Sequence, residues 1–346
     1  KLKALAMHYD NIGNYFTHPK LKAAFTFQDM YLGLSPYEAP ATYSLLQYTE
    51  LADGVWFPIG GMYRIVESLT SIAEGCGARF VYESPVKQIA VVGSRATGVV
   101  LEDGSTRSAD IVIANADLPY VYDQLLPDRG LAQRMMNKQF TCSTIMFYWG
   151  VDKVYPQLNT HNVFLSGDYR ASFDSIFKKN SLPQEPSFYV HAPARVDAEA
   201  APDGSDSLFV LVPVGHLDER ANQDWDAMTS RARAAVLKGL VKEGINDLEG
   251  HLKFEICYTP RDWAGRFNLA KGAAFGLSHN FSQVGYMRPR NRHQRYRNLY
   301  FTGSSTHPGA GLPMALLSGR LSAARILREA RSRQPSLYPT LAPASA

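Results

Sequence analysis

The segment that most constrains the fold runs from Asn298 to Leu327 and reads NLYFTGSSTHPGAGLPMALLSGRLSAARIL. Its apolar start predicts a short strand, its glycines and serines predict a turn, and the apolar periodicity that follows predicts a helix. Pro313 marks the start of this helix, because proline is favoured in the first helical turn, where its missing N–H has no acceptor to lose. The chain is therefore expected to contain a strand, a Gly-rich turn and a helix in direct succession.

This turn has the properties of an anion-binding site. Gly303, Ser304 and Gly311 are small residues that allow a ligand close to the backbone, and a helix N-terminus offers unpaired N–H groups and a positive dipole. A pyrophosphate or an anionic ring would suit it, although a purely structural connection shows the same pattern. His307 is the only titratable side chain between Thr302 and Gly319. It is interpreted either as a proton-transfer group or as a residue that hydrogen-bonds within the turn.

Composition narrows the class of protein. The chain has 346 residues, which suits two lobes, and its aromatic content of 12% is compatible with an apolar ligand. The net charge of +4 comes from evenly spread Lys and Arg, which argues against nucleic acid as a partner. The three cysteines are far apart and lack metal-ligand spacing, so we expect reduced intracellular thiols and no metal site.

The first part of the chain, residues 1–54, is predicted to form a helical lid with breaks near Pro19 and in the SPYEAP loop. Its aromatic and aliphatic side chains are interpreted either as core or as the lining of a ligand channel. Residues 55–118 then predict a helix from Met62 to Glu74, strands at 78–82 and in the run that begins SPVKQI, a hairpin turn at Asp103 and Gly104, and a buried strand in IVIA.

Residues 119–284 change in character and predict an inserted α+β lobe. Strands are expected at 142–151, 187–194 and 207–217, in an antiparallel sheet that walls either a cavity or an ordinary core, with a helix at 226–244. Residues 285–330 return to the strand, turn and helix described above. The tail, residues 331–346, is rich in Pro and Ser and is expected to be disordered.

The order TGSSTHPGAGLPMALLSG resembles the closing signature of bacterial and fungal phytoene desaturases, members of the FAD-dependent amine oxidase superfamily. Three further blocks resemble the same family in the same order, and the fungal branch is the most similar: residues 43–62, 161–177 and 187–217. The resemblance implies an α/β protein with a partial FAD-binding, Rossmann-like lobe (55–118 and 285–330), an inserted α+β substrate lobe (119–284) and the helical lid.

The resemblance also implies roles for single residues. Gly303 and Ser304 would approach the pyrophosphate and ribityl part of FAD, whereas Gly311, Leu312 and Met314 would lie under the flavin ring. Leu312 would act through its backbone N–H, which favours the negative charge of the reduced ring. Val86 is similar to the residue whose backbone meets the adenine in this superfamily. His307 is the candidate catalytic residue.

The function implied is desaturation of phytoene or a later carotene, with quinone or oxygen reoxidising the flavin. The alternatives left open are a carotene isomerase, another enzyme of the superfamily and a non-catalytic isoprenoid-binding escort protein. An amine substrate is disfavoured, because amine oxidases usually carry an aromatic residue where this chain has Gly309 to Gly311. We expect an intracellular enzyme, because its thiols are expected to be reduced, and a peripheral association with a membrane surface, because no stretch of the sequence is apolar over the length of a transmembrane helix.

The family's N-terminal GxGxxG turn has no counterpart in the sequence, which starts KLKALAMHYDNIGNYF. We therefore expect the 346 residues to be a fragment that binds FAD weakly or not at all by itself, because that turn normally holds the pyrophosphate.

Overall fold

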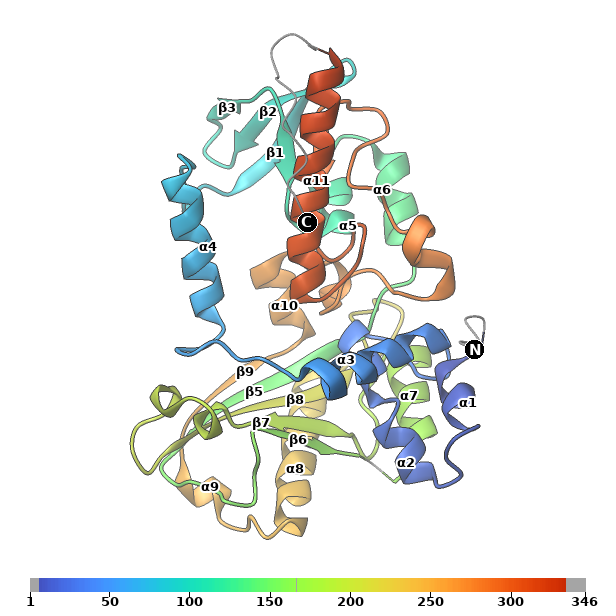
Figure 1. Cartoon of the computed structure of the whole chain (residues 1–346), viewed down its shortest axis with the longest axis vertical. Coiled ribbons are helices and arrows are strands. Elements are labelled where there is room, and N and C mark those ends of the chain that lie inside the picture. Colours follow the sequence, from blue (N-terminus) through green and yellow to red (C-terminus); the bar gives the residue numbers. More distant parts are fainter. Residues whose placement is uncertain (1–5, 166, 334–346) are drawn as a thin grey trace. The chain divides into compact units, whose positions relative to one another are not determined.

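The computed structural model describes residues 6–165 and 167–333, and these form two compact units, each a mixture of helices and strands (Figure 1). Unit 1 is built from the residues up to Ser84 and from Lys138–Phe281, and unit 2 from Pro85–Asn137 and the residues from Ser282 onward. The predicted α/β class is confirmed. Residues 55–84 belong to unit 1 and residues 119–137 to unit 2. The assignment of flavin and substrate roles to the predicted lobes stays a prediction.

Unit 1 contains an antiparallel sheet, within the described residues, whose strand order is β6 (His161–Phe164), β7 (Phe188–His191), β8 (Asp206–Val214), β5 (Ser143–Val151) and β9 (Leu252–Tyr258). β5 and β8 pair along their whole length, from Ser143 opposite Val214 to Val151 opposite Asp206. The expected antiparallel sheet is therefore present, with β6 and β9 in addition. Pro213 lies inside β8, beyond Leu211, the last residue that pairs with β7. Its missing N–H therefore removes no hydrogen bond between β7 and β8.

The core of unit 1 lies between this sheet and α8 (Trp225–Lys242), the helix predicted at 226–244. Residues of α8 at spacings of three and four face the sheet because they share one side of the helix. Along β8 every second side chain is buried, as expected for a strand with one face on a core. The helix side of the core is formed by Trp225, Met228, Ala232, Val236 and Leu240.

The N-terminal part of unit 1 is helical, as predicted, but its helices are short. In the described residues they are α1 (His8–Ile12), α2 (Pro19–Ala24), the 3-10 turns η1 (Phe27–Leu32) and η2 (Ala41–Ser44), and α3 (Leu45–Asp53). Gly33 follows η1 in a left-handed conformation, with φ of 62°, that ends the helical run. The other helices of unit 1 are α4 (Tyr63–Gly75), α7 (Tyr169–Lys178), α9 (Leu248–His251) and α10 (Pro260–Phe267), with shorter 3-10 turns at Pro193–Arg195, Ala198–Ala200 and Ala270–Gly272.

One strand prediction in this unit is wrong. Residues 78–82 form no strand, and Phe80 and Tyr82 stack on each other with ring centroids 6.2 Å apart. A run of β-prone residues becomes a strand only when a neighbour pairs with its backbone. No described strand pairs with this run.

Unit 2 contains two small sheets within the described residues. β1 (Val86–Val92), β2 (Arg95–Leu101) and β3 (Thr106–Ser108) form an antiparallel meander, and β4 (Val112–Ala114) runs parallel to β10 (Leu299–Phe301). The predicted turn at Asp103 and Gly104 is confirmed: Gly104 has φ of 83°, and the Ser105 N–H donates to Asp103 Oδ1 at 2.8 Å. The helices of this unit are α5 (Leu118–Tyr120), a π-helical turn η3 (Val121–Leu125), α6 (Arg129–Met136), 3-10 turns η7 (Phe281–Gln283, which begins at the unit boundary) and η8 (Gly285–Met287), and α11 (Leu312–Arg333).

α11 begins at the position indicated by Pro313 and continues to Arg333, so it includes the first three residues of the tail predicted to be disordered. The rest of that tail, residues 334–346, lies outside the described residues. No helix in the described part of the chain is long and apolar enough to cross a membrane. The three cysteines are free, and burial raises the pKa of the Cys142 thiol to about 12.

His293 makes the stability of unit 2 sensitive to acid. It is 1% exposed and stacks on Tyr296 at 4.5 Å, and its Nδ1 accepts the N–H groups of Arg295 and Tyr296 at 3.0 and 2.9 Å. Its Nε2 has no hydrogen-bond partner in the described residues. Burial lowers the pKa of His293 from 6.5 to about 4, since a charged imidazole would lose its hydration there.

Between pH 6.5 and 4 the unfolded chain therefore binds a proton at this residue that the folded chain does not. The free energy of unfolding is therefore expected to fall by roughly 1 to 3 kcal/mol as the pH drops from 6.5 toward 4, and to be unaffected by His293 at higher pH. Urea unfolding at several pH values measures this, with His293→Asn as the control, because asparagine keeps a hydrogen-bond acceptor and does not titrate. An equally steep acid dependence in the variant would assign the effect to other groups.

Candidate functional site: a glycine-rich turn and an apolar cavity

The glycine-rich turn begins where the two parallel strands of unit 2 end. The Thr302 N–H donates to the Ala114 carbonyl at 3.1 Å, which extends the pairing of β10 with β4 by one residue. Two side-chain bonds then join the strand ends: Thr302 Oγ1 donates to Asn115 Oδ1 at 2.8 Å, and Ser305 Oγ donates to Asp117 Oδ1 at 2.5 Å. The turn thus starts at the carboxyl edge of a parallel strand pair, where ligands of open α/β sheets bind.

Hydrogen bonds of buried side chains hold the shape of the turn and connect it to α11. Ser318 is fully buried; its hydroxyl accepts the Gly303 N–H at 3.3 Å and donates to the His307 carbonyl at 3.0 Å. Asn291 Nδ2 donates to the same carbonyl at 2.8 Å. Thr306 Oγ1 donates to the Gly303 carbonyl at 3.0 Å. Because these bonds pin both ends of the turn, its glycines hold one conformation.

Arg288 holds the middle of the turn. Its side chain is 2% exposed, and its guanidinium donates to the backbone carbonyls of Ser304 and of Thr306, the latter at 3.3 Å. A third bond reaches the Gln283 carbonyl at 3.4 Å. A planar fork of donors can satisfy several buried carbonyls at once, which a single ammonium group cannot do as well. Arg288 therefore acts as a structural clamp on the turn.

The outer side of the turn is open. Gly311 has φ of 107°, and a Cβ built on it meets no atom within 4 Å. Leu312 and Met314 follow in the first turn of α11 and are exposed, and that first turn carries no acidic residue. A long helix thus presents its N-terminus, without a competing carboxylate, to open space. This arrangement fits an anionic or partly anionic group such as a pyrophosphate or a reduced flavin ring.

The structure brings most of the predicted cofactor residues together. Gly303, Ser304, Gly311, Leu312 and Met314 all lie in the turn or in the first turn of α11. Val86 lies apart from them, at the start of β1 in the antiparallel sheet. His307 is half-buried, and its backbone N–H donates to the Pro289 carbonyl at 2.9 Å. Their contacts with a cofactor, and a catalytic role for His307, stay predictions.

Unit 1 contains a cavity of about 620 Å³, a size typical of sites for small organic ligands. Most of its wall is aromatic or aliphatic and comes from η1, α7 and the sheet. The main apolar residues of the wall are Phe27, Met30, Val55, Val163, Leu165, Tyr169, Phe173, Ile176, Phe188, Leu211, Pro213 and Phe275. Three apolar or aromatic side chains of residues 1–54, those of Phe27, Met30 and Tyr31, thus line this cavity.

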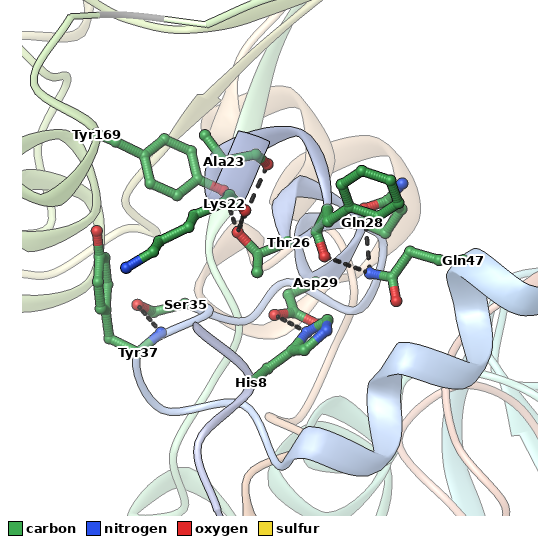
Figure 2. A network of polar contacts seen from close by, with 11 residues as sticks. His8, Lys22, Ala23, Thr26, Gln28, Asp29, Ser35, Tyr37, Gln47 and Tyr169 are labelled. Atoms are coloured by element: carbon green, nitrogen blue, oxygen red, sulfur yellow. Dashed lines mark hydrogen bonds and ion pairs between the residues drawn. The ribbon is translucent and has the colours of Figure 1, made fainter. Parts of the chain in front are cut away.

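The turn η1 contributes Phe27, Met30 and Tyr31 to this wall and is anchored through its other side chains, Gln28 and Asp29 (Figure 2). Asp29 and His8 are both fully buried, with His8 Nδ1 2.8 Å from Asp29 Oδ2. Burial raises the pKa of Asp29, and the bond to His8 opposes this shift. Because these buried hydrogen bonds hold η1 in place, the part of the cavity wall that η1 forms is rigid.

Sequence reasoning missed several residues that the structure places at the two sites. His161 shows no ligand-like spacing in the sequence, yet it lines the cavity. Asn291 and Ser318 show no motif of their own, because their role depends on contacts with residues 303–307. Ser318 did give one signal that could have been detected: it lies within the apolar pattern of a helix, and a buried hydroxyl needs a hydrogen-bond partner.

Most of the chain is similar to proteins of one known family. Residues 9–327 match the family model described as "Flavin containing amine oxidoreductase". A phytoene desaturase of Fusarium fujikuroi is 44% identical over 335 residues, covering 91% of this chain and 59% of that protein. A zeta-carotene-forming phytoene desaturase of Myxococcus xanthus is also 44% identical, covering 100% of this chain and 66% of that protein. The chain thus spans about three-fifths of the length of these curated relatives.

Solved structures with the same fold include an oxidoreductase from Methanosarcina mazei, with a TM-score of 0.60 at 16% identity, covering 92% of this chain and 68% of that one. A putrescine oxidase variant has a TM-score of 0.60 at 15% identity, covering 95% of this chain and 68% of the other. At such identities the likeness concerns the fold alone. The match of the family model over nearly the whole described chain decides the classification: the chain belongs to the flavin-containing amine oxidoreductase family.

Proposed function

We propose that the protein is an FAD-dependent desaturase of phytoene or of a later carotene. The observation that carries the proposal is the 44% identity to curated phytoene desaturases over almost the whole chain. Two features of the structure support it: an open helix N-terminus behind a glycine-rich turn, and an apolar cavity of about 620 Å³.

The apolar cavity suits a hydrocarbon substrate. Such a molecule has no heteroatom near the bond that reacts, so the protein can position it only through shape and the exclusion of water. Aromatic walls such as those of Phe173, Phe188 and Phe275 provide rigid apolar surface for a polyene chain. When bound, FAD would supply a two-electron acceptor that takes a hydride from one carbon, while the adjacent carbon loses a proton and the double bond forms.

The residues of the turn would act on the cofactor. Gly303 and Ser304 would approach the pyrophosphate and ribityl part of FAD, and Gly311, Leu312 and Met314 would lie under the flavin ring. The backbone N–H groups at the start of α11 would favour negative charge on the ring. His307 is the candidate acceptor of the proton released by the substrate.

The proposed setting follows from the substrate. A carotene dissolves in membranes rather than in water, so an intracellular enzyme associated with a membrane surface would meet its substrate there. Quinone or oxygen would reoxidise the reduced flavin.

The test uses the full-length protein loaded with FAD, with phytoene supplied in liposomes and quinone or oxygen as acceptor. We expect conversion to products with longer conjugated systems, whose absorption moves to longer wavelength. A heat-denatured sample and a sample without FAD serve as controls. Phytoene recovered unchanged from folded, FAD-loaded protein under both acceptors would contradict the proposal.

A further inference from the structure

Four polar side chains on the wall of the mostly apolar cavity are Tyr31, Glu50, His161 and Tyr189, called here the polar cluster; the hydroxyl residues Thr144, Ser172 and Ser187 also line the cavity. Among the described residues that line the cavity, Glu50 is the only carboxylate. A hydrocarbon ligand offers a carboxylate no hydrogen bond in exchange for the hydration that it displaces, which is unfavourable. Its presence in this wall therefore requires an explanation beyond the binding of an unsubstituted hydrocarbon.

Glu50 is held in place by a chain of two buried amides. Gln47 Nε2 donates to the Phe25 carbonyl at 2.8 Å and to Gln28 Oε1 at 3.2 Å, and Gln28 Nε2 donates to Glu50 Oε2 at 3.3 Å; the two glutamines are drawn in Figure 2. A backbone carbonyl only accepts, so it fixes the orientation of Gln47, and Gln47 in turn fixes that of Gln28. The amide that reaches Glu50 is thus a donor, and Glu50 is oriented as an acceptor.

The neighbours of Glu50 complete the cluster. Burial raises the pKa of the Tyr31 hydroxyl, and the adjacent Glu50 carboxylate raises it further, so this hydroxyl keeps its proton. His161 Nδ1 lies 2.6 Å from the Tyr189 hydroxyl, and the His161 ring stacks on His191 at 5.0 Å. Burial lowers the pKa of His161, and a neutral imidazole has one donor and one acceptor nitrogen. The cluster therefore combines a fixed acceptor with groups that can both donate and accept.

A ligand that satisfies this arrangement must be apolar over most of its length and carry one group that both donates and accepts a hydrogen bond. We propose that the polar cluster binds a hydroxyl group at the end of an elongated, otherwise hydrocarbon ligand, so that the protein prefers a carotene with a terminal hydroxyl to its unsubstituted counterpart. A hydroxyl replaces the water that Glu50 loses when the cavity fills, whereas a methyl group does not. The inference rests on the proposed function, since it assigns the cavity to the carotene.

The test compares two acyclic carotenes of equal length that differ by one terminal hydroxyl. Quenching of tryptophan fluorescence in the full-length, FAD-loaded protein measures the dissociation constant of each, and desaturation assays give KM and kcat. The wild-type protein is expected to bind the hydroxylated carotene about tenfold more tightly, as is typical of a hydrogen bond to a charged group. Glu50→Gln is expected to remove most of this preference, because its dissociation constant for the hydroxylated carotene should rise toward that for the unsubstituted one.

Glu38→Gln is the matched control, because Glu38 is exposed on the same unit and does not line the cavity. His161→Phe is a second test variant that keeps a ring against His191 and is expected to reduce the preference about threefold. Equal binding of the two carotenes by the wild-type protein would overturn the inference. So would an unchanged preference in Glu50→Gln, or an equal loss of kcat on both carotenes, which would make Glu50 a proton acceptor instead. If neither carotene is desaturated but the preference depends on Glu50, the proposed function fails and the inference stands.

Discussion

Replacing Arg288 by leucine is expected to lower the free energy of unfolding by about 4 kcal/mol and to reduce flavin content together with it. The guanidinium is 2% exposed and donates to the carbonyls of Gln283, Ser304 and Thr306. Leucine fills part of the volume but supplies none of these three hydrogen bonds. Since two of the three carbonyls belong to the glycine-rich turn, the turn should lose its fixed shape before the rest of unit 2 unfolds.

Urea unfolding and the ratio of bound flavin to protein measure the two effects in the full-length protein. Arg290→Leu is the matched control, because Arg290 stands two residues away and is exposed, so its loss should change stability by less than about 0.5 kcal/mol. Arg288→Lys should lie between them, since an ammonium group cannot reproduce the planar fork. If Arg288→Leu and Arg290→Leu unfold at the same urea concentration, Arg288 does not clamp the turn.

Replacing Gly311 by valine is expected to lower flavin affinity and the rate of desaturation by about tenfold or more. Gly311 has φ of 107°, a conformation that costs a β-branched residue roughly 1 to 3 kcal/mol. A Cβ there meets no protein atom within 4 Å, so the substitution creates no clash inside the described structure. The new side chain would instead occupy the open side of the turn, where the flavin ring is proposed to lie.

Gly93→Val is the control that separates the effect of backbone strain from the effect of a side chain at the proposed flavin site. Gly93 also has a positive φ, of 58°, and open space around its Cβ, but it lies in the hairpin between β1 and β2. Both variants should lose similar stability, and only Gly311→Val should lose flavin. Absorbance at the flavin maximum after gel filtration, together with product formation, measures the difference. Full flavin content and normal turnover in Gly311→Val would refute the placement of this turn beside the cofactor.

The strand, turn and helix of the closing segment could be predicted because their signals are local. Pro313 at the start of α11, the apolar LYF of β10 and the small residues between them each carry a conformational preference that tertiary contacts did not override. The same is true of α8 and of the hairpin at Asp103 and Gly104. A strand forms only if a distant segment pairs with it, and for this reason the β propensity of residues 78–82 predicted a strand that is not present.

The apolar cavity could not be located from the sequence. Its wall joins Phe27 on η1, Phe173 on α7 and Phe188 on β7, which are up to 161 residues apart in the chain, and each of them also resembles an ordinary core residue. Glu50 and His161 gave no signal for the same reason: a single polar residue acquires its role from what surrounds it, and only folding brings Tyr31, Glu50, His161 and Tyr189 to one wall.

The sequence alone determined the class of fold, the position of the glycine-rich turn and the family that it resembles, because turn chemistry, helix starts and ordered motifs are properties of neighbouring residues. The tertiary structure decided that Arg288, Asn291 and Ser318 hold this turn and that an apolar cavity carries an oriented carboxylate. Those facts depend on burial, since a donor or a charge acquires a defined partner only where water has been excluded.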